Sequence, residues 1–483
     1  MPNFFNYSFE NPWFFTNYSF LFILGLFLLL YAFLLDKSVL KKAYVILFSL
    51  FFYYKSSGPY LIFFIIMIIA DYNFAHWIEK VINKRIRKLL LTLSILCSLS
   101  FLIYFKYAGF FIQTINDLFE SSFYLSDLFL PIGISFYTFQ SISYIIDVYD
   151  RKIPSSKNFT DYAFYMTFFP HLVAGPIVRA RDFIPQINNP LVVDRNLLYE
   201  SLFRIMTGFG KKLLLADFLA KYVDMLYSSP SSYSGAENLL GMYAYSCQIY
   251  FDFSGYSDIA IGIALLMGYR LKENFENPYR SVSITQFWRK WHISLSTWLR
   301  DYIYIPLGGN RKGVLNTYLF LMITMTIGGF WHGANWKFVL WGVLHGLALA
   351  VHKWFAGKSE KSTKGSNSLV RSIYVLITFH FVSLLWIFFR ASHSSVAWDS
   401  IEQIFTNQHW ADYYGFYLGR TTLVYLLLGS LIIIFSPRRV KELVRAAFIK
   451  IPVWSLPILL IIFFQIIQQF RNTEIQPFIY FQF

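Results

Sequence analysis

The histidines that interrupt apolar sequence are the first candidates for chemistry. His332 lies in the segment GGFWHGANWKFVLWGVLHG (328–346), at a break between two apolar runs, and His345 lies near the end of this segment. A buried neutral imidazole can act as a general base because its pKa lies close to the working pH. A structural histidine bonded to a backbone carbonyl explains His332 equally well. On a continuous helix the two histidines would be turned about 220° apart, so they would not share a face.

A second cluster combines basic residues with aromatic rings. The segment 274–310 is polar and aromatic, and it is too long for a simple connecting loop. It contains the string WRKWH (288–292), which ends at His292, and it continues to Arg300. Rings interleaved with bases suit an anchor at the depth of the lipid headgroups. They also suit a pocket for an anionic, nucleotide-bearing donor.

Two carboxylates form the third cluster, in the string QIYFDFSGYSD (248–258). Asp252 and Asp258 flank Ser254-Gly255, where we expect the helix to be interrupted. In or beside a membrane span, such groups could line a polar cavity or bind a proton. The alternative is structural pairing at the helix break, with arginines of the segment 280–300 as partners.

The composition of the chain predicts the class of protein in which these clusters lie. Of the 483 residues, 56% are hydrophobic and 21% aromatic, while 14% are charged, against about 25% in an ordinary soluble domain. The chain is therefore predicted to be an integral membrane protein. The formal charge of +15 fits cytoplasmic loops that face anionic lipid better than nucleic-acid binding. Cys97 and Cys247 both lie in apolar runs, so no disulfide framework is expected.

Apolar stretches close to spanning length recur along the chain, among them 41–54, 59–77 and 129–147. We predict about eleven spanning helices in one domain that covers residues 1–483, with the short or broken stretches as tilted or re-entrant helices. The alternation of basic and non-basic loops places both termini outside, so that the tail 471–483 is extracytoplasmic.

Several motifs that would indicate other chemistry are absent from the sequence. There is no Walker A motif, no G-x-G-x-x-G, no G-x-S-x-G, no H-E-x-x-H and no metal spacing of Cys and His. ATP-driven transport, dinucleotide cofactors and zinc chemistry are unsupported, and no bound cofactor or metal is predicted. No internal repeat of the kind found in many transporters is visible.

Three strings together resemble the membrane-bound O-acyltransferase (MBOAT) family. They are FFPHLVAGPIVRARDF (168–183), the long string from YFDFSGYSD to IPLGGNR (250–311) and the segment 328–346. The resemblance is to the bacterial branch typified by the membrane subunit of alginate O-acetyltransferase, and more distantly to the D-alanine transfer protein of teichoic acids. It implies an all-α membrane protein, a ring of about eleven helices around a central funnel.

The resemblance also implies the residues of the site. The histidine of W-H-G is His332, the general base, and the histidine of W-R-K-W-H is His292, which supports it. His292 lies in a segment that we expect to be helix-compatible and therefore to tolerate alanine. The basic candidates would bind the phosphates of the donor, and Asn335 would orient the donor or stabilise the oxyanion. The full set of further substrate-binding candidates is Trp331, Asn335, Trp336, Arg289, Lys290, Arg300 and Asp252.

The leading hypothesis is an O-acetyltransferase of the bacterial inner membrane. It would take an acyl group from cytoplasmic acetyl-CoA and pass it across the membrane for O-acylation of a cell-envelope polysaccharide. The resemblance implies an extracytoplasmic or lipoprotein transferase of the SGNH type as partner. An enzyme that acylates a lipid or a protein, and a transporter that makes no bond, are the alternatives.

The aromatic tail QPFIYFQF (476–483) suggests a relay. It resembles a short C-terminal motif of this branch, and Tyr480 would bring its hydroxyl to His332. A phenol has a pKa of about 10, so an aryl ester keeps more transfer potential than an alkyl ester. The alternative is that the tail only packs on the membrane or on a partner.

Overall fold

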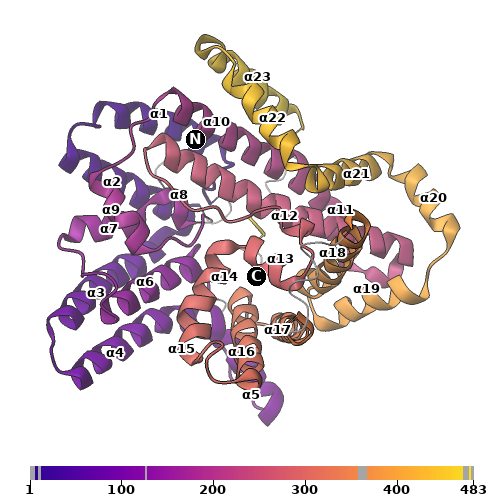
Figure 1. Ribbon diagram of the computed structural model, residues 1–483, viewed down its shortest axis with the longest axis horizontal. Helices are drawn as coiled ribbons and strands as arrows, with labels where there is room; N and C mark the ends of the chain where they lie inside the picture. The colour runs from indigo at the N-terminus through magenta and orange to yellow at the C-terminus, as the bar shows by residue number, and fades with distance from the viewer. Residues whose placement is uncertain are drawn as a thin grey trace. The chain divides into compact units, whose positions relative to one another are not determined.

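The computed structural model describes residues 6–8, 12–125, 128–173, 175–356, 367–470 and 478–479. Within these ranges the chain is helical and has no β-strand, which confirms the predicted all-α class (Figure 1). The chain divides into two compact units. The first comprises residues 1–205 and 259–272, and the second comprises residues 206–258 and 273–483.

The first unit contains the N-terminal helices. At its centre, the buried carboxylate of Asp71 on α3 accepts a hydrogen bond from the Tyr162 hydroxyl at 3.1 Å and one from Ser98 at 3.5 Å. Buried polar groups need such partners. The helices are α1 (Tyr18–Phe33), α2 (Ser38–Ser57), α3 (Leu61–Lys80), α4 (Lys84–Leu102), α5 (Ala108–Phe119), α6 (Ile134–Tyr149), α7 (Phe159–Thr167), α8 (Phe169–Leu172), α9 (Ala180–Asn188) and the first part of α10 (Arg195–Phe209).

The second unit contains all the clusters named above. Its helices are α11 (Asp217–Ser228), α12 (Gly235–Leu266, to residue 258), α13 (Ile284–Lys290), α14 (Ile293–Leu299), α15 (Ile305–Leu307), α16 (Val314–His332), α17 (Trp336–Ala356), α18 (Ser368–Arg390), α19 (Ser394–Thr406), α20 (Trp410–Gly419), α21 (Thr421–Phe435), α22 (Arg438–Ile449) and α23 (Leu456–Phe470). Two π-helical segments, η3 (Gly210–Ala216) and η6 (Arg300–Tyr304), continue α10 and α14.

Among the described residues, six helical stretches are long and apolar enough to cross a membrane, or eight if two bent helix pairs are each counted as one span. The predicted number of about eleven is higher. One reason is that the predicted runs 41–54 and 59–77 fall in one helical stretch, 38–80, which turns at Gly58 with φ 62°. Another is that α6 has only 16 residues, below the roughly 20 that a span requires.

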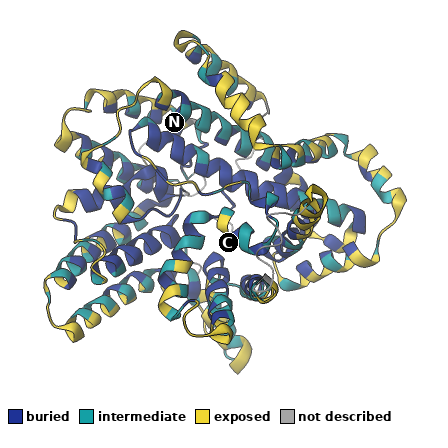
Figure 2. Cartoon of the chain, in the orientation of Figure 1, coloured by how far each residue is buried: buried dark blue, intermediate teal, exposed yellow. Residues whose placement is uncertain are grey.

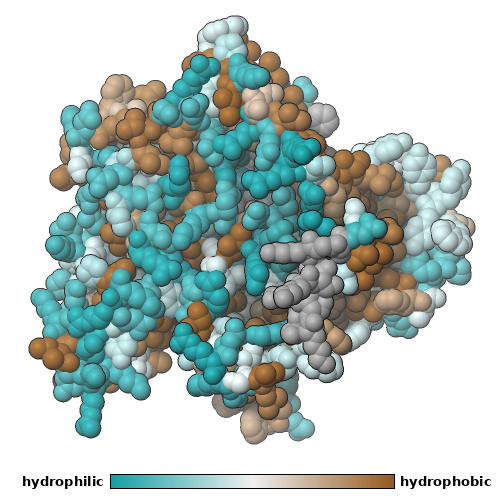
Figure 3. All heavy atoms as spheres, viewed as in Figure 1, coloured by the Kyte–Doolittle hydropathy of each residue, from teal (hydrophilic) through white to brown (hydrophobic). Residues whose placement is uncertain are grey.

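Hydrophobic side chains lie exposed on several helices, as expected for surfaces that face lipid (Figure 3). Phe22, Leu47 and Ile461 each expose about two thirds of their surface or more, at 70%, 67% and 69%. By contrast, α12 is the most enclosed of the long apolar helices, with 83% of its most apolar 18 residues buried (Figure 2). This helix therefore belongs to the protein core.

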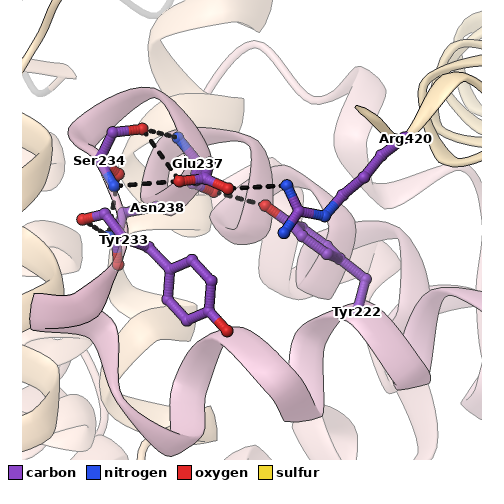
Figure 4. Close-up of polar contacts among 6 residues, drawn as sticks. All are labelled: Tyr222, Tyr233, Ser234, Glu237, Asn238 and Arg420. Carbon is purple, nitrogen blue, oxygen red and sulfur yellow. Dashed lines mark hydrogen bonds and ion pairs between the residues drawn. The ribbon is translucent and has the colours of Figure 1, made fainter. Parts of the chain in front are cut away.

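The bend between α20 and α21, which measures 101°, is tied to the start of α12 (Figure 4). Ser234 and Glu237 form a capping box, in which each side chain accepts a hydrogen bond from the other residue's backbone N–H, at 3.1 and 3.3 Å. The second oxygen of the Glu237 carboxylate accepts from Arg420 at 2.8 Å. The Arg420 guanidinium also lies over the ring of Tyr222, 5.9 Å from its centroid.

The helices α16 and α17 approach each other closely through glycines. A Cβ atom on Gly329 would lie 2.2 Å from the carbonyl oxygen of Phe338, and one on Gly342 would lie 2.4 Å from that of Met325. Side chains larger than hydrogen do not fit at such separations. These glycines therefore determine where the end of α16, and with it His332, is placed.

Candidate active site

His332 is the last residue of α16. The helix ends because Gly333 adopts an extended conformation, with φ −164° and ψ 150°. The imidazole is buried and is surrounded by the rings of Trp331, Trp341 and Phe389, whose centroids lie 5.0, 5.2 and 5.1 Å from its own. An imidazole in such an apolar enclosure has a restricted set of orientations, as a positioned proton acceptor requires.

His292 lies in the two-residue break between α13 and α14. Its backbone is in the left-handed region, with φ 42° and ψ 55°. The expectation that His292 lies in a helix-compatible segment is therefore wrong, because a left-handed residue interrupts the helix here. For a residue other than glycine such a conformation is uncommon, and it is typical of functional sites. Its side chain is buried against the ring of Phe253, 4.6 Å away.

Asn274 holds the imidazole of His292, and sequence reasoning missed it. The side-chain oxygen of Asn274 accepts from the backbone N–H of Ser294 at 3.2 Å and from the Ser294 hydroxyl at 2.9 Å. A backbone N–H can only donate, so this bond fixes which end of the amide is the oxygen. His292 Nδ1 lies 3.2 Å from the same oxygen, and it must carry the proton to bond to it.

The neutral tautomer of His292 is therefore the one with hydrogen on Nδ1, which leaves the lone pair on Nε2. Burial lowers the pKa of His292 to about 3, so the ring is neutral near pH 7. The amide nitrogen of Asn274 donates to Ser257 on α12 at 3.3 Å. The asparagine thus links the break at His292 to the core helix.

The two predicted histidines are brought together around one tryptophan. The ring centroid of Trp331 lies 5.0 Å from that of His332 and 6.2 Å from that of His292. His345 lies elsewhere: its Nδ1 accepts from the indole N–H of Trp288 at 3.3 Å. It is separated from the pair by Trp341, which contacts both His345 and His332, so His345 supports the wall of the site.

Asn335 and Trp336 lie at the start of α17. The side-chain oxygen of Asn335 accepts from the backbone N–H of Lys337 at 3.0 Å, so it caps this helix. Trp336 is 60% exposed. Of the predicted substrate-binding residues Trp331, Asn335 and Trp336, Trp331 is the one that the described contacts place against both histidines.

The predicted phosphate-binding residues fall into two groups. Arg289 and Arg300 are exposed, and Arg300 pairs with its neighbour Asp301 at 2.8 Å. Lys290 is half-buried. Burial lowers the pKa of Lys290, the Glu276 carboxylate raises it, and the guanidiniums of Arg280 and Arg371 lower it.

Lys290 therefore lies near two like charges and one carboxylate, and this surplus of positive charge favours an anion. Arg280 and Arg371 come from η5 (Pro278–Arg280) and α18, and neither was predicted as a binding residue. A signal was available for Arg280, because it lies in the same polar segment as His292. Arg371 is 81 positions further along than Lys290, so only the fold relates these two residues.

The carboxylates on α12 are paired, but not with the expected partners. Asp252 pairs with Lys212 at 2.5 Å, and Asp258 pairs with Lys211 at 2.6 Å. The prediction of arginine partners from 280–300 is therefore wrong. The expected helix break is wrong as well, because α12 continues through Gly255. This glycine instead permits close approach, since its Cβ would lie 2.8 Å from the carbonyl oxygen of Gly208.

Two residues of the C-terminal tail are described, and both are buried within the second unit. The Phe478 ring lies 5.3 Å from that of Phe253, which in turn contacts His292. The predicted relay residue, Tyr480, lies outside the described residues. It follows Ile479 directly in the sequence.

These observations define the class of protein: an integral membrane protein whose second unit gathers two histidines around a buried tryptophan. Comparison with known proteins extends this. Residues 149–363 match the family model for MBOAT, the membrane-bound O-acyltransferase family. All three strings that suggested this family lie inside the matched range.

Curated relatives match most of the chain. The probable alginate O-acetylase AlgI of Pseudomonas putida is 40% identical over 416 residues, which cover 81% of this chain and 84% of that protein. The protein of the same name from Pseudomonas aeruginosa is 44% identical over 351 residues (70% of this chain), and the match spans 66% of its length. The peptidoglycan O-acetyltransferase of Helicobacter pylori is 38% identical over 379 residues, covering 73% and 71%. The chain therefore belongs to the MBOAT family of acyltransferases, as predicted.

Proposed function

We propose that this protein is an O-acetyltransferase that supplies acyl groups for O-acylation of a cell-envelope polysaccharide. The observation that carries the proposal is the convergence of His332, His292 and the tail residues Phe478 and Ile479 in one compact unit. The names of the relatives, which refer to alginate and peptidoglycan, support a polysaccharide as final acceptor. Acetyl-CoA on the cytoplasmic side is the proposed donor, at an inner membrane that the chain crosses several times with both termini outside.

In the proposed first step, His332 takes the proton of the Tyr480 hydroxyl as this oxygen attacks the thioester carbonyl. The bond between carbonyl carbon and sulfur breaks, an aryl ester forms, and the proton passes from His332 to the leaving thiolate to give free CoA. His292 and Asn335 assist by orienting the donor or stabilising the oxyanion. The wall of Trp331, Trp341 and Phe389 around His332 supports this role.

In the second step, the aryl ester passes its acyl group to a serine of an extracytoplasmic or lipoprotein transferase of the SGNH type. That partner then acylates the polysaccharide. Lys290, with Arg280 and Arg371 beside it, is the best placed of the basic candidates for the phosphates of the donor, and Arg289 and Arg300 are the other two. A phosphate-binding role fits the guanidinium fork.

The test is release of CoA by the purified protein supplied with labelled acetyl-CoA. We expect His332→Ala to lower the rate by about 10²–10⁴-fold, which is typical for loss of a positioned acid–base group. The matched control is His380→Ala, which removes an exposed histidine on α18 of the same unit. Equal rates for wild type and His332→Ala would overturn the mechanism. A protein that releases no CoA at all would instead point to transport.

The acceptor is tested in cells. We expect mass spectrometry of the envelope polysaccharides to show loss of O-acetyl groups when the protein is absent. Acylated lipid or protein that disappears in its place would assign the chain to an MBOAT that acts on those acceptors. Tyr480→Phe keeps the ring and removes the nucleophile, so wild-type acetylation by this variant would overturn the relay.

A further inference from the structure

Three charged side chains meet inside the second unit. Lys212 lies in the π-helical segment η3, and its ammonium contacts Asp217 at 2.8 Å and Asp252 at 2.5 Å. Lys212 and Asp252 are only 1% and 2% exposed. Burying such a group costs more than it returns in stability when well-packed apolar residues could replace it. These buried charges are therefore expected to have a function besides stability, and π-helical turns are frequent at functional sites.

The second oxygen of the Asp252 carboxylate binds the C-terminal segment. It accepts the backbone N–H of Ile479 at 2.9 Å. The side chains of Phe478 and Ile479 are 0% and 2% exposed, so this part of the tail is inserted among the helices of the second unit. The carboxylate of the ion pair thus binds a residue that lies 227 positions further along the chain.

Two aromatic rings of α12, Phe253 and Tyr256, form an aromatic seat, the surface on which this segment packs. The ring of Phe478 packs against those of Tyr256 and Phe253, with centroids 4.7 and 5.3 Å away. On α12, Phe253 directly follows Asp252, and Tyr256 lies one turn after it. The ammonium of Lys212 lies over the same Tyr256 ring, 5.6 Å from its centroid. The ion pair and the aromatic seat are therefore one continuous surface.

A hydrogen bond to a backbone N–H sets the register of a peptide without reading its side chains. Here it fixes Ile479, the residue directly before Tyr480. Phe253 contacts both Phe478 and His292, so the docked segment is one ring away from the candidate active site. Lys212 pairs with Asp252, and a carboxylate paired in this way is a stronger acceptor than a neutral amide.

We propose that Asp252, held by Lys212, is the docking site for the C-terminal segment of this chain and positions Tyr480 for acyl transfer. Asp252 is a positioning residue, because it acts through the tail. This inference rests on the proposed relay, and it adds the site that fixes the register of the tail.

The test compares three full-length variants in detergent. Asp252→Asn weakens the acceptor, and Phe478→Ala removes the ring from the seat while both ion pairs stay intact. Asp258→Asn is the matched control, since it removes the neighbouring pair with Lys211 on the same helix and leaves Lys212 and Asp252 in place. The readouts are hydrogen exchange at the Ile479 amide, acylation of Tyr480 by mass spectrometry, and kcat and KM for acetyl-CoA.

We expect Asp252→Asn to speed exchange at Ile479 by about 10-fold, because a neutral acceptor replaces a charged one. Phe478→Ala should speed this exchange by about 100-fold or more, because a buried ring is lost. Acylation of Tyr480 and kcat fall, while the KM for acetyl-CoA stays unchanged because the donor site is intact. Asp258→Asn changes none of these. If Asp252→Asn does not fold, Phe478→Ala alone carries the test.

Two results would overturn the inference. Unchanged exchange at Ile479 in both variants would show that Asp252 does not dock the tail. Faster exchange with normal Tyr480 acylation would show that docking does not position the tyrosine. Failure of the relay itself is distinguishable, because Tyr480→Phe would then retain full activity while exchange at Ile479 stayed slow.

Discussion

Asn274 offers the sharpest test of how the site is organised. Its side-chain oxygen accepts from His292 Nδ1 at 3.2 Å and twice from Ser294, and its nitrogen donates to Ser257. Asn274→Leu keeps a side chain of similar size and removes every one of these bonds. The backbone carbonyl of Asn274, which accepts from Ile293 at 2.9 Å, remains.

The size of the effect follows from these contacts. If His292 takes up charge in the transition state, the lost bond is one to a charged group, worth about 1.5–3 kcal/mol. At 1.4 kcal/mol for each factor of ten, kcat should fall by about 10- to 100-fold. The loss should not exceed that of removing His292, for which about 10²–10⁴-fold is typical. Stability should fall as well, by about 1–3 kcal/mol for a buried donor left without an acceptor.

Asn274→Asp separates the two effects. A carboxylate still accepts from His292 Nδ1 and from Ser294, so the same tautomer is held. We expect kcat within about tenfold of wild type. The negative charge raises the pKa of His292, so the acid limb of the pH–rate profile should move to higher pH.

The assay is release of CoA from acetyl-CoA, with kcat and KM compared at equal amounts of folded protein. Tryptophan fluorescence during a thermal melt measures the folded fraction separately. Equal kcat for the leucine variant and wild type would refute the claim that Asn274 controls His292. Equal losses in the leucine and aspartate variants would show that the tautomer is not what matters.

Three further outcomes are expected. Gly329→Ala should destabilise the protein by about 1–3 kcal/mol through overpacking against α17, whereas Gly429→Ala, with nothing within 4 Å of the added Cβ, should not; equal melting temperatures would contradict this. His292→Ala should be less stable than His292→Asn by about 1 kcal/mol, since asparagine tolerates the left-handed conformation; melting temperatures in the opposite order would count against it. The pKa of His292 is about 3 when folded and about 6.5 when unfolded, so stability should be lost as the pH falls below about 6.5, by up to about 2 kcal/mol near pH 5. The fall in melting temperature from pH 7 to pH 5 should be smaller in His292→Asn.

Much of the architecture could be predicted because the bilayer restricts it. Apolar runs in a chain with 14% charged residues must form helices, since no water is present to satisfy the backbone. Hydropathy does not show how such runs join, however. The stretch 38–80 contains two predicted runs, and the chain turns between them at Gly58, where φ is 62°.

The candidate histidines could be predicted because they lie in short motifs, but their surroundings could not. Asn274 is 18 positions before His292, and its role depends on the left-handed turn that no residue pattern indicates at a histidine. Distance along the sequence also led to the wrong prediction for the partners of Asp252. Arg280 and Arg289 are 28 and 37 positions after Asp252, closer in sequence than Lys212, which is 40 positions before it.

The partner of Asp252 was determined instead by Gly255. A glycine between two carboxylates suggests a helix break when it is considered alone, because glycine is a poor helix former. In an enclosed helix it has a second use, since it lets another backbone approach, here at Gly208. That approach places the lysines of η3 opposite the carboxylates, and the charge that was expected to need arginines is satisfied from the neighbouring helix. Without a side chain at position 255, Asp252 has one oxygen for Lys212 and the other for the tail.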